Sequence, residues 1–219
     1  MLSDSYEILM PAMVEPITLT EAKRYLRVDF GSEDVTISGL ITSARRYAEN
    51  MLHKSLTTQT IQMIHEVDPV AAGALSGAVD APMDADLLLE RPNIPLLGNA
   101  RVIIPILMGP VQSFTSLEWQ LTRADVPEWT LLAATDPNGN PNYRLDTSPE
   151  PNELNVFTIL AATRYRLTYV AGMNALDQKL LDIRPAMLSL INYWYEYREG
   201  ALVPDGIRQQ FAERRVFVL

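Results

Sequence analysis

Few side chains in this sequence have the type and spacing that catalysis or metal binding requires. The chain has two histidines and no cysteine. His53 lies near the end of a helical pattern and His65 alternates with apolar residues as in a strand, and neither shows the HExxH spacing of a zinc site. We therefore expect both histidines to be structural, and we predict no metal and no cofactor.

The usual sequence signatures of enzymes are also missing. The sequence contains no G-x-S-x-G, no Walker A loop and no G-x-G-x-x-G. Adjacent acids such as Glu33 and Asp34 lie in polar stretches, as solvated surface residues do. A glycosidase needs two carboxylates held across a cleft, and no such pairing follows from the sequence. A non-enzymatic role is therefore expected.

Aromatic side chains are the more informative feature. The segment 192–200, "NYWYEYREG", places four rings within five positions. With the apolar residues before them, these rings give a helix an apolar arc that is wider than one flat core requires. They either fill the chain's own core or seal a contact with another subunit, since Tyr and Trp are enriched at interfaces. The candidate subunit interface consists of Tyr47, Met51, Tyr193, Trp194, Tyr197 and Arg198.

Two prolines set the expected helix boundaries near the C-terminus. Pro185 would clash and lose a hydrogen bond in mid-helix, so we expect one helix to end near Asp182 and another to begin with Pro185 in its first turn. Pro204 can begin a further short helix. The tail after it is basic and then apolar, and it either frays or docks into a partner. The candidate docking tail is Arg214, Arg215, Val216, Phe217, Val218 and Leu219.

The N-terminal part of the chain is predicted to form two helices. Thr18 and Glu21 have the spacing of a capping box, which predicts a short helix from about residue 19 to 27. Apolar residues then recur at intervals of three and four up to Leu52, after a negatively charged first turn. This second pattern predicts an amphipathic helix of roughly 19 residues.

From residue 56 the apolar period changes from helical to two, which predicts strands. Turn sequences such as "DPNGNPN" separate them and no helical pattern intervenes, so an antiparallel sandwich or small barrel is expected. Residues 69–85 are rich in Ala, Gly and Pro and predict an exposed loop. The expected strands lie within 60–67, 86–90, 100–107, 113–121, 128–134, 142–146, 153–159 and 163–170.

Composition and charge restrict the function classes. The chain has 219 residues, 47% of them hydrophobic, which is enough to bury a core. The net charge is −9, and most of the acidic excess lies in residues 55–172, so tight DNA binding is not expected there. No basic leader and no apolar run of membrane-spanning length is found, so we expect a soluble, unexported chain.

These patterns together predict an α+β fold. A small helical bundle, made of N-terminal and C-terminal helices, carries an inserted antiparallel β-rich domain. The expected division is 1–55 for the N-terminal helices, 56–172 for the β-rich domain with an excursion at 69–99, 173–203 for the C-terminal helices, and 204–219 for a short helix and the tail.

Several segments, taken in order, resemble the long form of the tailed-phage head–tail connector (adaptor) family. They are "PITLTEAKRYLRVD", "ITSARRYAENMLHKSLTTQT", "GPVQSFTSLEW", "YRLDTSPEP", "YRLTYVAG" and "IRPAMLSLINYWYEYRE". The resemblance spans roughly residues 15–200 and is interrupted near 69–99. It implies a structural virion protein, assembled in the host cytoplasm, that forms a ring beneath the portal protein, typically twelve-fold.

In such a ring the resemblance implies that DNA passes through the channel without specific binding. A downstream stopper or tail-terminator protein would dock on the far side, and residues 214–219 would reach the portal. A second hypothesis is a tail or baseplate module that binds a ligand through its β-rich domain. Trp119 and Trp129 would be its anchors, although their alternation with leucines also suits core positions.

Overall fold

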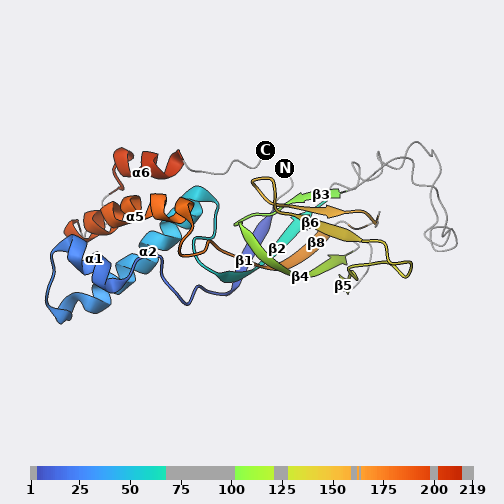
Figure 1. The fold of residues 1–219 in the computed structure, drawn as a ribbon, viewed down its shortest axis with the longest axis horizontal. Coiled ribbons are helices and arrows are strands. Elements are labelled where there is room, and N and C mark those ends of the chain that lie inside the picture. The colour runs from blue at the N-terminus through green and yellow to red at the C-terminus, as the bar shows by residue number, and fades with distance from the viewer. Residues whose placement is uncertain are drawn as a thin grey trace.

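In the computed structural model, helices gather at one end of an elongated molecule and strands at the other (Figure 1). The structure describes residues 4–67, 102–120, 128–158, 162, 164–197 and 202–213. The expected α+β class is confirmed. None of the helices within these ranges is long and apolar enough to cross a membrane.

The helical end contains α1 (Leu19–Leu26), α2 (Asp34–Leu52), α5 (Gln178–Glu196) and α6 (Asp205–Ala212), with a short 3-10 turn, Gly31–Glu33, leading into α2. The first helix begins at the expected cap, where the backbone N–H of Glu21 donates to Thr18 Oγ1 at 3.2 Å. The apolar faces of all these helices meet in one core, which includes Ile37, Ile41, Leu52, Met187, Leu190, Ile191 and Phe211. The first and last parts of the sequence therefore fold as one packing unit.

Contrary to the sequence-based expectation, α5 continues through Pro185 as one helix. The proline ring removes one backbone hydrogen bond. Buried residues on both sides of it, Met187 among them, nevertheless pack into the bundle core, and Arg184 forms an ion pair with Glu21 of α1. This packing offsets the local cost of the proline, so the predicted break between Asp182 and Pro185 is wrong.

The strands form two antiparallel sheets that share one hydrophobic core, as in a sandwich. The larger sheet has the order β1 (Ser5–Met10), β2 (Gln59–Glu66), β8 (Arg164–Ala171), β4 (Val111–Gln120) and β5 (Thr130–Leu131). The smaller has the order β3 (Val102–Pro105), β7 (Glu153–Val156) and β6 (Tyr143–Asp146). Their common core includes Ile61, Met63, Leu117 and Leu167 from the larger sheet, and Ile104, Leu154 and Val156 from the smaller.

Strand β1 was not predicted, because residues 1–55 were expected to contribute only helices. Its sequence, "SYEILM", alternates over only four residues, and its partner β2 comes 50 to 59 positions later, with pairs from Ser5↔Ile64 to Met10↔Thr60. The expected strand at 86–90 and the excursion at 69–99 lie outside the described residues.

Candidate interaction surfaces

Three of the aromatic residues at the helical end hold helices of one chain together. The ring of Tyr47 in α2 meets Trp194 of α5 edge-on, with ring centroids 5.8 Å apart, and Phe211 of α6 at 5.9 Å. Met51 is half-buried and packs against the same core. Tyr47, Met51 and Trp194 therefore stabilise the bundle from within.

Tyr193 near the end of α5 and Tyr197, the residue that follows this helix, lie close to one another. Their ring centroids are 5.0 Å apart, and the Tyr193 hydroxyl donates to the Leu202 carbonyl at 2.9 Å. Tyr197 is 60% exposed. This pair is the part of the candidate interface that remains accessible to another molecule. Arg198 and residues 214–219 lie outside the described residues.

A buried ionic network lies between the bundle and the sheets, and sequence reasoning missed it. Arg45 and Glu49 of α2 are 3% and 2% exposed. Arg45 donates through Nη1 to Glu49 Oε2 at 2.9 Å and through Nε to Glu15 Oε2 at 2.8 Å. Glu49 Oε1 also accepts from the backbone N–H of Leu56 and from Gln59 Nε2, each at 3.1 Å. The network thus connects α2 with the segment before α1 and with the start of β2.

Burial and charge act in opposite directions on this pair. Burial raises the pKa of Glu49 above its usual range, although the Arg45 charge and the two N–H donors counteract it. Burial alone would lower the pKa of Arg45, but the hydrogen bond to Glu15 and the charges of Glu49 and Glu15 raise it. The spacing of Arg45 and Glu49, four residues apart on the apolar face of a helix, was the available sequence signal.

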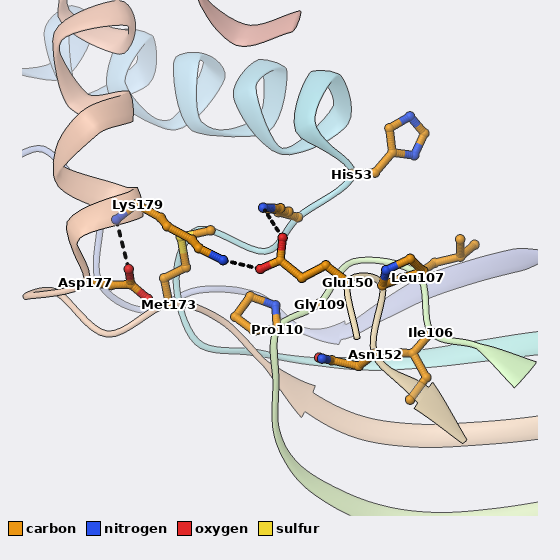
Figure 2. Close-up of a pocket in the computed structure, with 12 residues that line it drawn as sticks. His53, Ile106, Leu107, Gly109, Pro110, Glu150, Asn152, Met173, Asp177 and Lys179 are labelled. Carbon is orange, nitrogen blue, oxygen red and sulfur yellow. Dashed lines mark hydrogen bonds and ion pairs between the residues drawn. The ribbon is translucent and has the colours of Figure 1, made fainter. Parts of the chain in front are cut away.

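Figure 2 shows a small cavity where the bundle meets the loops of the β-rich domain. Its volume is about 90 Å³, and apolar residues such as Met173 and Ile106 contribute to its lining. At its rim Glu150 forms ion pairs with Lys179 of α5 and with Lys54, the latter at 3.2 Å. The hydrogen bond from Lys179 holds the pKa of Glu150 below its usual value. This carboxylate therefore clamps two helix ends to a loop of the β-rich domain.

The side chains that were considered for chemistry occupy structural positions. His53 caps the C-terminus of α2 in a left-handed conformation, φ 55°. His65 Nδ1 lies 2.7 Å from Asp4 Oδ1, which connects β2 with the residue before β1. Within the described ranges, no group of three or more His, Cys, Asp or Glu side chains could hold a metal ion.

The two tryptophans of the ligand-binding hypothesis are not freely exposed. Trp119 and Trp129 are both half-buried. The Arg166 guanidinium carbon lies 4.4 Å from the centre of the Trp129 ring, a cation–π arrangement. A ligand that stacked on this face of Trp129 would first have to displace that guanidinium.

Comparison with known families and structures gives two kinds of match. Residues 16–78 match the model of the "Phage gp6-like head-tail connector protein" family, which covers α1, α2 and β2. The resemblance expected from the sequence is thereby confirmed for this part of the chain. The search of curated proteins found no match.

The fold of the whole chain is similar to chains in solved particle structures. One comes from the "Neck of empty GTA particle computed with C6 symmetry", at 15% identity and a TM-score of 0.62 over 98% of this chain and 97% of that chain. A second is from the "Virion of native gene transfer agent (GTA) particle", at 16% identity and a TM-score of 0.60 over 98% and 96%. A third is from the "Neck of native GTA particle computed with C12 symmetry", at 16% identity and a TM-score of 0.57 over 100% and 97%. At such identities the match shows a shared fold.

Proposed function

We propose that this protein is a structural, non-enzymatic head–tail connector of a phage-like particle. In this proposal it forms a ring beneath the portal, extends the DNA channel and offers a docking surface to the next tail component. The observation that carries the proposal is the likeness of the whole fold, helices and sheets together, to chains from particle necks solved with rotational symmetry. The connector-family match over residues 16–78 supports it independently.

The geometry of the helical end suits a ring of identical subunits. Subunits in a ring meet through two different surfaces, so each must present outward-facing groups besides those that hold its own bundle together. Tyr197, with Tyr193 beneath it, is such a group, whereas Tyr47 and Trp194 face their own chain. We therefore place the centre of the subunit contact on Tyr193 and Tyr197, with Arg198 beside them in sequence.

Replacing Tyr197 with alanine is expected to weaken ring formation while leaving the free subunit folded. Exposed aromatic residues at the centre of an interface contribute about 2 kcal/mol or more, which corresponds to roughly a thirtyfold change in affinity. Analytical ultracentrifugation in the presence of portal would measure the concentration at which rings form. Tyr25→Ala is the matched control, because Tyr25 is an exposed tyrosine of α1. Assembly of Tyr197→Ala at the wild-type concentration would contradict this assignment.

The proposal also assigns portal docking to the tail, residues 214–219. Truncation after Ala212 removes the tail and leaves the packed ring of Phe211 in place. We expect the truncated protein to keep its fold but to lose portal binding in a pull-down or by size exclusion. Normal portal binding by the truncated protein would rule the tail out as the docking element.

A further inference from the structure

Strand β1 presents an open and apolar sheet edge. It is the outermost strand of the larger sheet, and among the described residues no strand pairs with its other side. All six of its residues are exposed. The apolar exposure continues beyond it, with Met10 at 59% and Met13 at 93%. Such an edge is a template for pairing with another strand, and proteins usually protect it with lysine, proline or a very short strand.

Of the two edge strands of this sheet, β1 offers the longer edge, with Pro11 only after its last residue. Strand β5 has two residues, so it offers little backbone for pairing. Strand β1 has six, and residues 4–15 contain no lysine or arginine. A register shift lies between Ile8 and Met10, so the regular part of the edge runs from Ser5 to Ile8. The edge thus has room for a partner strand of about four residues.

The tail of this chain has the composition that fits that edge. Residues 216–219 are Val, Phe, Val and Leu, four apolar residues of which the first three have high β propensity, with no proline or glycine. Arg214 and Arg215 precede them, and the tail has no acidic side chain, whereas the edge carries the exposed Glu7. Length, β propensity and charge therefore all favour pairing between the tail and β1.

The end of α6 and strand β1 both contact the same turn of α2. Phe211 of α6 packs on Tyr47 of α2, and the Tyr6 hydroxyl of β1 is 3.5 Å from Asn50 Oδ1 of α2. Positions 47 and 50 are neighbours on one helix surface, about 5 Å apart. When residues 216–219 lie along the edge, residues 213–215 form the connection from the end of α6, and the four steps from Ala212 to Val216 span about 13 Å when extended. The tail therefore starts beside the turn of α2 that β1 contacts, with a short connection to bridge the remaining gap.

We propose that residues 214–219 pair with the free edge of β1 in the same chain, and that the portal later takes the tail from this edge. The docked tail covers Tyr6 and Ile8 and keeps its own apolar side chains out of water. The second step rests on the proposed function, because it needs a portal that binds the tail. The first step stands without it.

Introduced disulfides can test this docking directly, because the chain has no cysteine of its own. The test pairs Glu7→Cys in turn with Val216→Cys, Phe217→Cys and Val218→Cys, which covers neighbouring registers. A tethered segment has a high effective concentration, so we expect an intramolecular disulfide at least about ten times more abundant than in the control pair Thr130→Cys with Phe217→Cys. Thr130 lies on β5, the opposite edge of the sheet. Yields no higher than the control, or disulfides only between chains, would overturn the proposal.

Hydrogen exchange provides a second measurement, which compares the full and truncated chains without introduced cysteines. Truncation after Ala212 is expected to speed exchange of the amides in Ser5–Met10 by about tenfold, while β8 in the sheet interior is unchanged. Equal exchange in the full and truncated chains would overturn the docking.

Added portal separates this inference from the proposed function. If both hold, portal lowers the disulfide yield when added before oxidation. If the β1 disulfide forms in a protein that never binds portal, the proposal that the tail docks on β1 stands and the proposed connector function is refuted. Portal binding by a chain that forms no β1 disulfide would support the connector and refute the docked tail.

Discussion

Replacing Glu49 with alanine is expected to lower the free energy of unfolding by about 3 kcal/mol or more. The substitution removes the buried partner of the Arg45 Nη1 donor and the acceptor of the N–H groups of Leu56 and Gln59. Arg45 would then remain buried at 3% exposure with Glu15 as its remaining charged partner. Breaking one half of a buried ion pair costs far more than the pair contributes, because the remaining charge cannot be solvated.

For a chain of this size, a loss of about 3 kcal/mol lowers the Tm by roughly 6–12 °C, which differential scanning calorimetry resolves. Arg164→Ala is the matched control, since it breaks the exposed pair of Arg164 with Glu66. We expect that change to cost less than about 1 kcal/mol. If Glu49→Ala and Arg164→Ala lower the Tm equally, the network does not hold the two parts of the molecule together.

The second large effect is expected from Gly172→Ala. Gly172 follows β8 with φ +150°, and a Cβ at this position would lie 2.5 Å from the carbonyl carbon of Thr57. The glycine is fixed there, because its N–H donates to the Pro110 carbonyl and its carbonyl accepts from Gln112 Nε2, each at 2.9 Å. The added methyl collides with backbone, so the segment leading into β2 must move. We expect a loss of about 3 kcal/mol or more.

Gly39→Ala is the matched control, and it is expected to raise the stability rather than lower it. Gly39 lies in the interior of α2, and a Cβ there would meet nothing within 4 Å. Alanine should therefore stabilise the helix by about 1 kcal/mol. Thermal unfolding followed by circular dichroism gives the Tm of each variant for comparison. A Tm for Gly172→Ala as high as that of Gly39→Ala would show that the two connecting segments do not cross closely at Thr57.

Local patterns predicted the elements that depend on local physics. The apolar period of α2 and the capping box at Thr18 are properties of neighbouring residues, and the structure confirms both. Strands β2 and β8 alternate because one face of each meets the shared core, as in Tyr165, Leu167 and Tyr169. In these segments the sequence period and the tertiary environment agree.

The elements that sequence reasoning missed depend on partners far away in the chain. Strand β1 exists because β2 pairs with it, and α5 remains continuous because core packing holds both sides of Pro185. The clamp at Glu150 joins residues that are 96 and 29 positions away. The propensities of neighbouring residues do not predict such long-range pairing and packing. The aromatic segment was expected to be helical, and α5 carries most of it, but only the structure separates Trp194, which faces its own bundle, from the exposed Tyr197.

The most direct test of the connector proposal is the mass of the assembled protein. Light scattering with negative-stain imaging would be carried out on the protein alone and mixed with the portal protein encoded by the same genome. The proposal predicts a closed ring of this protein, either alone or only when portal is present. A chain that remains monomeric and does not bind portal would contradict it.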